Sequence, residues 1–149
     1  MVKLIIVDDH KHVRQAWSWV LSMSARIDVI AECSNGEEAI EAAKSLQPDV
    51  ILMDIHMEPV NGILATRMIR SIAPQIKIIG ISVQAEPSYV REMLRSGAHG
   101  YVTKNSPSAE MIAAIDEVLA GNTYLCQEVS TFSALKASLG LNPNTSNIC

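Results

Sequence analysis

Positive charge is scarce in this chain of 149 residues. Twelve Lys and Arg stand against sixteen Asp and Glu, which gives a formal net charge of −4. Contacts from Lys and Arg to phosphates dominate nucleic-acid affinity, and the chain lacks the residues for a broad basic surface. We therefore expect this stretch to bind DNA poorly on its own, so that any DNA contact would need a further domain.

Long apolar runs and paired cysteines are also missing. The apolar run Leu4–Val7 stops at Asp8, too short for a signal-peptide core, and no later run has the length that crosses a bilayer. The cysteines Cys33, Cys126 and Cys149 are odd in number and widely spaced, which fits neither a disulfide framework nor a zinc knuckle. We expect a soluble cytoplasmic protein with reduced thiols and no membrane association.

Hydrophobic residues are plentiful, at 48% of the chain, and are enough for one sizeable core. Short apolar runs rich in β-branched residues predict five strands that are buried on both faces. These runs cover residues 3–7, 29–33, 50–54, 76–82 and 100–103.

Segments with helical periodicity separate these strands. The clearest is residues 13–21, whose apolar side chains follow an i, i+3, i+4, i+7, i+8 stripe. Ser34 and Glu37 form an S-x-x-E capping box, which predicts the start of a second helix. Two more helices are predicted over residues 62–71 and 87–95.

The last helix is predicted from Ser106, a good N-cap residue, and from Pro107, since proline is preferred at the first helical position. It should end near residue 121. Strand and helix thus alternate five times with short links, the pattern of a parallel sheet with helices on both faces. We expect a flavodoxin-like, doubly wound α/β fold of five helices and five strands in the order 2-1-3-4-5, with function at the strands' carboxyl ends.

Residues 122–149 differ in composition from the rest. A weakly amphipathic stretch rich in Ser and Thr reaches residue 139, and the last ten residues have too few apolar groups to offset the entropy of ordering. We expect a folded domain at 1–121, followed by a helical linker and a disordered tail at 122–149.

Three acids stand at the ends of strands that should be neighbours. Asp8 and Asp9 close the first strand and Asp54 closes the third, so their carboxylates should converge on one pocket. Unpaired carboxylates would repel and raise one another's pKa values, and a hard divalent cation with oxygen ligands resolves that repulsion. Mg²⁺ (or Mn²⁺) is expected because Mg²⁺ combines a few carboxylates with water and phosphate oxygens.

A hydroxyl and an ammonium should join these acids. Ser82 ends the fourth strand and Lys104 follows the fifth, so both are expected in the same crevice. Each alone would be an ordinary surface residue. Together with the acids they could bind the equatorial oxygens of a phosphoryl group, and a carboxylate nucleophile beside Mg²⁺ and Lys suits phosphoryl transfer.

The same residues resemble a known family. The chain is similar, over about residues 2–121, to bacterial two-component response-regulator receiver domains of the type that precedes a LuxR-type helix-turn-helix output. The spacing is specific, because the intervals of 28 residues from Asp54 to Ser82 and 22 from Ser82 to Lys104 fit that type. The resemblance rests on Asp8-Asp9, Met53-Asp54, Gly62, Ser82 and the run from Gly97 to Lys104.

This resemblance implies roles for the acids. Asp54 would accept a phosphoryl group from the phosphohistidine of a sensor histidine kinase. Asp9 and Asp54 would bind Mg²⁺ directly, together with the backbone carbonyl of His56, and Asp8 would assist. The protein would be no enzyme in the usual sense but a phosphoacceptor that assists its own phosphorylation and dephosphorylation.

The resemblance also implies a switch. Lys104 would contact the phosphoryl group, Ser82 would move toward a phosphoryl oxygen, and Tyr101 would follow by changing rotamer. The face made by the fourth helix, fifth strand and fifth helix would then change and control an output. The bound phosphate can shift such a two-state equilibrium only by the difference in its contacts with the two states.

The chain departs from the family's usual pattern at three places. Pro59 stands one place later than usual after Asp54, and Asn105 replaces the proline that often follows the lysine. Val83, beside the switch hydroxyl, is bulkier than the usual Ala or Gly, and we hypothesise that it restricts access of water or phosphodonor to the site.

Two other features allow alternative interpretations. His10 and His12 flank the acids and suggest a transition-metal site. Their spacing is weak support for such a site, because a metal needs several converging ligands. We favour the interpretation that both are solvated histidines at the start of a helix. Trp19 and Met23 lie off the buried stripe of the first helix, where they would form an exposed apolar pair. Local packing and a homodimer contact explain that pair equally well.

The output remains a separate question. Relatives with a LuxR-type output carry a DNA-binding module after a linker, and no basic helix-turn-helix segment follows Leu125 here. A truncated transcriptional regulator is favoured over a stand-alone receiver that docks on a partner protein. Two other classes are disfavoured: a haloacid dehalogenase-type phosphatase, which needs Asp-x-Asp, and a flavodoxin, whose flavin phosphate Asp8 and Asp9 would repel.

Overall fold

Strands and helices alternate along the chain, as the apolar pattern predicts. The computed structural model describes residues 1–83 and 86–126, so most of the expected linker and tail lies outside the described residues. The elements are β1 (Val2–Val7), α1 (Lys11–Ser22), β2 (Ile27–Cys33), α2 (Gly36–Leu46), β3 (Val50–Asp54), α3 (Gly62–Ile72), β4 (Lys77–Ser82), α4 (Pro87–Arg95), β5 (Gly100–Thr103), α5 (Ser108–Leu119) and β6 (Tyr124–Leu125).

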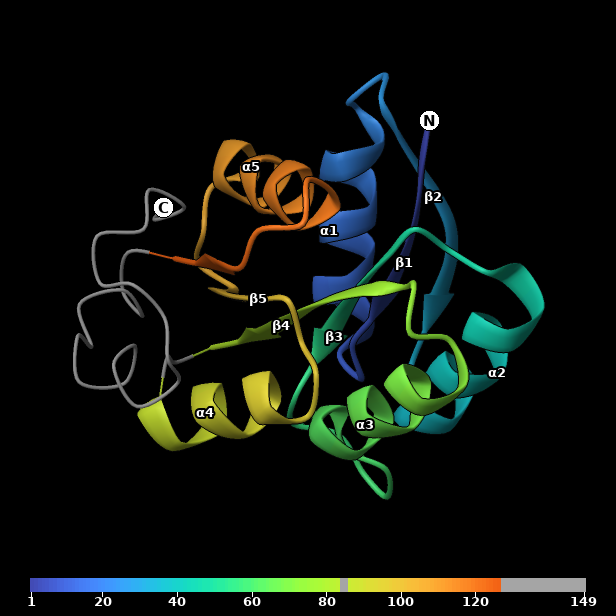
Figure 1. Cartoon of the computed structure of the whole chain (residues 1–149). Helices are drawn as coiled ribbons and strands as arrows, with labels where there is room; N and C mark the ends of the chain where they lie inside the picture. The colour runs from blue at the N-terminus through green and yellow to red at the C-terminus, as the bar shows by residue number, and fades with distance from the viewer. Residues whose placement is uncertain (84–85, 127–149) are drawn as a thin grey trace.

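The strands form one parallel sheet in the order β2-β1-β3-β4-β5-β6. Helices α1 and α5 cover one face of the sheet, and α2, α3 and α4 cover the other (Figure 1). The central strand β3 is buried along its whole length because it has neighbours on both edges and helices on both faces. The predicted doubly wound, flavodoxin-like fold is thus confirmed, and the order of its first five strands is the expected one.

A sixth strand was not predicted. After α5, Gly121 adopts φ 92° and turns the chain back to the sheet, where β6 pairs in parallel with β5. The backbone N–H of Cys126 donates to the carbonyl of Tyr101 at 3.1 Å. Residues 124–126 are all nearly fully buried, so the start of the predicted linker is part of the sheet.

Two helix starts differ from the prediction by one residue. The N-cap of α2 is Asn35, whose side chain accepts from the backbone N–H of Glu38, while the Glu38 carboxylate accepts from the N–H of Ser34 at 2.9 Å. The capping arrangement is therefore shifted by one place, because Ser34 and Asn35 are both good capping residues. Helix α5 likewise has Pro107, not Ser106, at its N-cap position.

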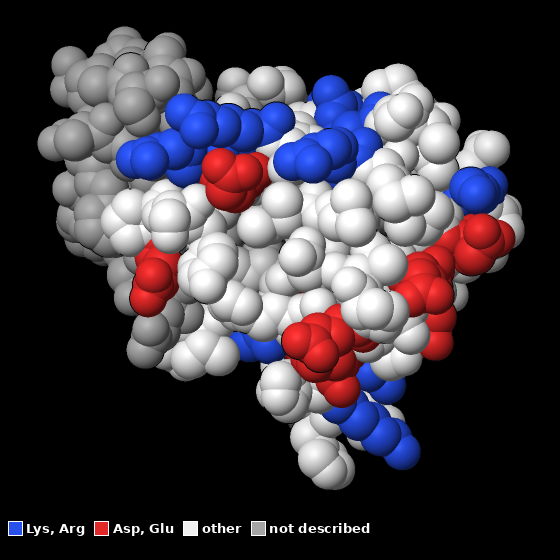
Figure 2. Space-filling view, turned by 90° about the horizontal axis from the view of Figure 1, so that it is seen from below, with Lys and Arg blue, Asp and Glu red and all other residues white. Residues whose placement is uncertain are grey.

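Charge is unevenly spread over the surface. On the face that α3 and α4 form, Lys and Arg gather toward one side, while Asp and Glu lie mainly on the other (Figure 2). Helices α3 and α4 contribute Arg67, Arg70, Arg91 and Arg95. Within the part of the chain that the structure describes, none of the helices is both long and apolar enough to cross a membrane.

Candidate functional site

The acids converge because their strands are neighbours in register. Val7 pairs with Met53, so the next residues along each strand, Asp8 and Asp54, lie side by side at the carboxyl edge of the sheet. Asp8 is fully buried and Asp54 is 1% exposed, whereas the side chain of Asp9 is 41% exposed. The predicted acid pocket is therefore present, with two buried carboxylates and one that reaches solvent.

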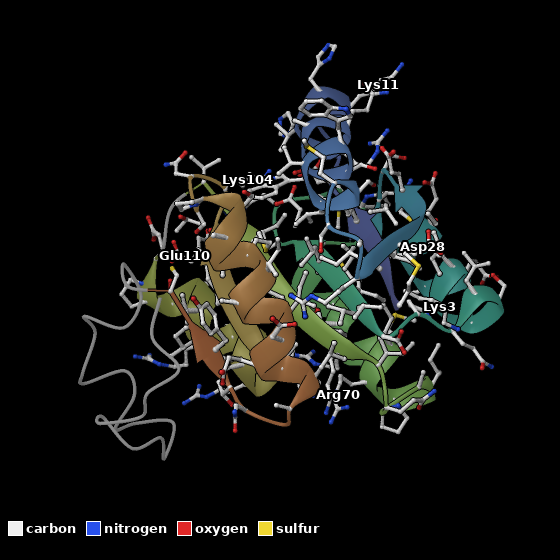
Figure 3. The ribbon with its side chains drawn as sticks, turned by 90° about the horizontal axis from the view of Figure 1, so that it is seen from above. Lys3, Lys11, Asp28, Arg70, Lys104 and Glu110 are labelled. Carbon is white, nitrogen blue, oxygen red and sulfur yellow. The ribbon has the colours of Figure 1, made fainter. Side chains whose placement is uncertain are left out.

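Lys104 faces both buried acids. Its backbone N–H donates to the carbonyl of Ser82 at 2.7 Å, which holds the residue at the edge of the sheet. Its Nζ lies 2.8 Å from Oδ2 of Asp8 and 3.5 Å from Oδ2 of Asp54, and its side chain is 10% exposed. In a view from above, Lys104 lies between α1 and the start of α5 (Figure 3).

One ammonium does not neutralise this cluster. Burial raises the pKa of Asp54 to about 7; Lys104 opposes the rise, while Asp8 and then Asp9 add to it. With all three acids ionised, three negative charges and the single positive charge of Lys104 leave two negative charges. That deficit is the charge of one divalent cation.

The donor atoms fit such a cation. Oδ2 of Asp8 and Oδ2 of Asp54 are buried and accept no directed hydrogen bond from the described residues, although Lys104 makes an ion-pair contact with each. Donor atoms of Asp8, Asp9, His10 and Asp54 all lie within 4.8 Å of one another. The carboxylate oxygens are the ligands that Mg²⁺ and Mn²⁺ prefer.

A pocket of about 630 Å³ opens beside the acids, and Asp9 and His56 form part of its wall. The ring of His56 packs edge-on against the ring of Tyr89, with 4.9 Å between centroids. The backbone N–H of His56 donates to Oδ1 of Asp54 at 3.2 Å and lowers the pKa of that carboxyl. Its carbonyl as a metal ligand stays a prediction.

Ser82 and Tyr101 form a second, neutral part of the site. Their hydroxyls lie 2.7 Å apart, and both residues are fully buried. Burial raises the pKa of Tyr101 to about 12, and the hydrogen bond to Ser82 opposes that rise, so the phenol is un-ionised at neutral pH. The sequence predicts Ser82 in the crevice of the acids, and the family resemblance adds Tyr101 as its partner in the switch. The structure shows that the two hydroxyls form a hydrogen bond.

Comparison with known proteins agrees with this arrangement. Residues 4–116, most of the chain, match the sequence model of the response regulator receiver domain. The chain belongs to this family. It is a receiver domain of the LuxR type, as the resemblance in its motifs predicts.

Several curated relatives are whole regulators. Response regulator GacA of Pseudomonas syringae pv. syringae (strain B728a) is 36% identical over 137 residues, covering 92% of this chain and 64% of GacA. Transcriptional regulatory protein DegU of Brevibacillus brevis is 36% identical over 129 residues, covering 87% of this chain and 55% of DegU. The receiver chain thus spans less than two thirds of the length of these relatives.

Solved structures of similar fold are also receivers. A two-component response regulator of the LuxR family from Aurantimonas sp. SI85-9A1 superposes with a TM-score of 0.81 at 29% identity, covering 88% of this chain and 96% of that one. The signal receiver domain of the putative response regulator NarL from Mycobacterium tuberculosis gives a TM-score of 0.78 at 30% identity, covering 81% and 98%.

Two glycines of this receiver exist because other groups come very close. A Cβ on Gly62 would lie 2.1 Å from the backbone oxygen of Asp54, so the loop that follows β3 can return over Asp54 only with glycine there. Pro59 in that loop follows a cis peptide bond. A Cβ on Gly80 would lie 2.8 Å from Cε of Met93 and 3.1 Å from the ring of Tyr101, so Gly80 makes room for both side chains.

Sequence reasoning missed Gly80 and two supports of Asp8. The Arg14 guanidinium donates to the carbonyl of Asp8 at 2.8 Å and pairs with Glu32 on β2. The backbone N–H of His10 donates to Oδ1 of Asp8 at 2.8 Å. Each of these contacts joins elements distant in sequence or depends on loop geometry, so spacing alone gave no signal for them.

The remaining predicted features lie at the surface. Trp19, on α1, and Met23, at its C-cap, are 69% and 70% exposed, so both side chains are exposed as expected. Val83 is 59% exposed and, with His56 and Tyr89, lines a second pocket of about 400 Å³. His56 and Tyr89 also line the pocket beside the acids, and an effect of Val83 on access to the site stays a prediction.

Proposed function

We propose that this receiver is a cytoplasmic protein and accepts a phosphoryl group on Asp54 from the phosphohistidine of a sensor histidine kinase, in a reaction that needs Mg²⁺ or Mn²⁺. The observation that carries the proposal is the Asp54 carboxylate itself. It is buried, its Oδ2 accepts no directed hydrogen bond from the described residues and lies 3.5 Å from Nζ of Lys104, and the next two residues, Ile55 and His56, line an open pocket.

In the proposed reaction, a carboxylate oxygen of Asp54 forms a bond to phosphorus as the P–N bond of the phosphohistidine breaks. The bonding electrons stay with the imidazole nitrogen, which then takes a proton from solvent. Lys104 holds positive charge beside the phosphoryl oxygens, and burial excludes competing water. Asp8, Asp9 and Asp54, with the His56 carbonyl, would hold the metal, which supplies further positive charge against the transferred group.

The switch would start at Ser82. A phosphoryl oxygen on Asp54 gives the Ser82 hydroxyl a charged partner, and its bond with Tyr101 changes in consequence. Tyr101 lies on β5, and its carbonyl accepts from Cys126 beyond β6, so a shift of β5 would reach the chain after the receiver as well as the α4–β5–α5 face. We propose that the output is transcription, through a DNA-binding domain like those of LuxR-type relatives.

A second candidate is a stand-alone receiver that acts by docking on a partner protein. It is favoured by the gathering of Lys and Arg toward one side of the face that α3 and α4 form, on a chain whose net charge is −4 (Figure 2). A homodimer is a further possible assembly, and the exposed Trp19 and Met23 support it. Sedimentation of a Trp19→Ala variant tests the homodimer, which requires a lower self-association constant in the variant.

Intact mass spectrometry after incubation with acetyl phosphate or a phosphoramidate tests the phosphoacceptor. The wild type should gain the mass of one phosphoryl group in Mg²⁺ and none in chelator. Asp54→Asn should gain none, whereas the control Asp28→Asn, at an exposed acid of β2, should behave as the wild type. A gain that persists in Asp54→Asn or in chelator contradicts the proposal.

A further inference from the structure

The His10 side chain is the feature that the proposed function leaves unused. Its Nδ1 lies 2.9 Å from Oδ1 of Asp9 and 3.3 Å from Oδ1 of Asp8. Its backbone N–H is fixed by the hydrogen bond to Asp8, and it stands at the N-cap position of α1 with extended backbone. The imidazole nitrogen therefore points into the acid cluster, although the side chain is 68% exposed.

His12 provides an internal comparison. It also follows the acids closely in sequence and is exposed, but it lies in the first turn of α1. Among the described residues, the group of donors close enough to share one ion contains His10 and not His12. Sequence spacing treats the two histidines alike, and the structure separates them.

We propose that His10 Nδ1 is a ligand that makes this a mixed nitrogen and oxygen site, which selects late first-row divalent ions such as Co²⁺, Ni²⁺ and Zn²⁺ over Mg²⁺. The inference rests on the metal site of the proposed function but not on phosphoryl transfer. Two buried carboxylate oxygens, on Asp8 and Asp54, belong to the same cluster and accept no directed hydrogen bond from any described residue; Lys104 is their shared ion-pair partner, and one ammonium does not balance the acids, so these oxygens can also bind a cation.

The ligand chemistry favours selectivity. Mg²⁺ is a hard cation that takes oxygen ligands and keeps waters, and it gains little from an imidazole. Imidazole suits the later metals, whose affinity for a given nitrogen and oxygen site rises along the series to Cu²⁺. His10 should therefore strengthen Co²⁺ or Zn²⁺ binding and leave Mg²⁺ binding nearly unchanged.

Only a small movement of the His10 ring is needed for the four residues to bind one ion. Metal–nitrogen and metal–oxygen bonds are about 2.0–2.2 Å, so two ligands on opposite sides of an ion are roughly 4 Å apart. The four donors lie within 4.8 Å of one another, and the exposed His10 ring can close the difference by turning about its side-chain bonds. Asp8 and Asp54 need not leave their buried positions.

Metal titration of the unphosphorylated chain tests the inference, with any affinity tag removed. Calorimetry with Mg²⁺ and with Co²⁺ would be run on wild type, His10→Gln and the control His12→Gln, and the visible absorption of bound Co²⁺ would report nitrogen ligation. His10→Gln should weaken Co²⁺ binding by about tenfold or more, change the Co²⁺ spectrum and leave the Mg²⁺ affinity within about twofold. His12→Gln should match the wild type in every measurement.

Three results would overturn the inference. Equal Co²⁺ affinity in wild type and His10→Gln would mean that His10 only forms a hydrogen bond or ion pair with the acids. An equal loss in His12→Gln would point to surface binding. If neither ion binds the wild type, the metal site of the proposed function fails as well, whereas normal Mg²⁺ binding with unchanged Co²⁺ selectivity removes the His10 inference alone.

Discussion

The acid pocket and the hydroxyl pair lie at the same edge of the sheet and are built in opposite ways. In the acid pocket, Asp8 and Asp54 are buried, charged and only partly compensated by Lys104. In the hydroxyl pair, Ser82 and Tyr101 are equally buried but neutral, and they satisfy each other at 2.7 Å. The first arrangement costs stability until a cation binds, whereas the second contributes stability as it stands.

The difference assigns a task to each part. A buried site with uncompensated negative charge binds cations that neutralise it, so the acid pocket is the part that can bind a ligand and react. A satisfied hydroxyl pair has a defined geometry that a new hydrogen-bond acceptor can disturb, so it can report what happens in the pocket. The backbone N–H of Lys104, in the acid pocket, donates to the carbonyl of Ser82, in the hydroxyl pair, so one hydrogen bond joins the two parts.

Removing the Lys104 ammonium should have the largest effect on the stability of the acid pocket. Lys104→Met leaves two buried carboxylates without their shared cation, and the free energy of unfolding at pH 8 should fall by about 3 kcal/mol. Mg²⁺ should restore most of the loss, because it supplies the missing charge. Urea unfolding with Mg²⁺ and with chelator measures both effects. The control Lys11→Met, at an exposed lysine in the first turn of α1 (Figure 3), should change stability by less than about 0.5 kcal/mol.

Removing the charge of Asp54 should act in the opposite direction. The folded-state pKa of Asp54, about 7, is above the ordinary value of 3.8, so the folded protein holds this proton more tightly than the unfolded chain. The contribution of this group to stability therefore falls as pH rises from about 4 to 7. In chelator, Asp54→Asn should be more stable than the wild type by about 2 kcal/mol at pH 8 and nearly equal to it near pH 4.

The Asp54→Asn result is read from urea unfolding at both pH values, with Asp28→Asn as the control for a surface acid. A variant that is less stable than the wild type at pH 8 would mean that Lys104 fully compensates the pocket. The contrast with the hydroxyl pair would then disappear.

The hydroxyl pair should behave as a satisfied hydrogen bond. A double-mutant cycle with Ser82→Ala and Tyr101→Phe should give a coupling of about 1 kcal/mol in urea unfolding. The coupling should be constant from pH 5 to pH 8, because the pKa of Tyr101 is about 12. Tyr89→Phe, at a partly exposed tyrosine, is the control and should change stability by less than about 0.5 kcal/mol. A pH-dependent coupling would connect the pair to the acids even without phosphate.

Most of this site could be predicted because strand position decides it. Asp8, Asp54 and Ser82 end runs of β-branched residues, and parallel strands bring such ends to one edge. The order of the first five strands then makes Asp8 and Asp54 neighbours, as the register confirms. Lys104 follows the fifth strand and was expected in the same crevice, whereas Tyr101 came only from the family resemblance; the structure brings Lys104 to the acids and Tyr101 to Ser82.

The rest depends on contacts that periodicity does not record. Strand β6 has two residues, too short for a recognisable pattern, and it exists because Gly121 turns the chain onto the free edge of β5. Gly80 leaves room for the side chains of Met93 on α4 and Tyr101 on the next strand, which come close to it only in the folded protein. His10 and His12 are equivalent in sequence, and only the turn of backbone between β1 and α1 brings one of them to the acids.

A change in access to the pocket should have the smallest effect of the changes considered. Val83 lines the 400 Å³ pocket beside His56 and is 59% exposed, so Val83→Ala removes two methyl groups from the entrance and leaves the buried network intact. Loss of the phosphoryl group from Asp54, followed by intact mass, should be a few times faster, with stability within about 0.5 kcal/mol of the wild type. Met68→Ala, at an exposed residue of α3, controls for apolar surface. An unchanged rate would mean that water reaches the phosphoryl group by the side of Asp9, where the larger pocket opens, and that access is set by the acid pocket alone.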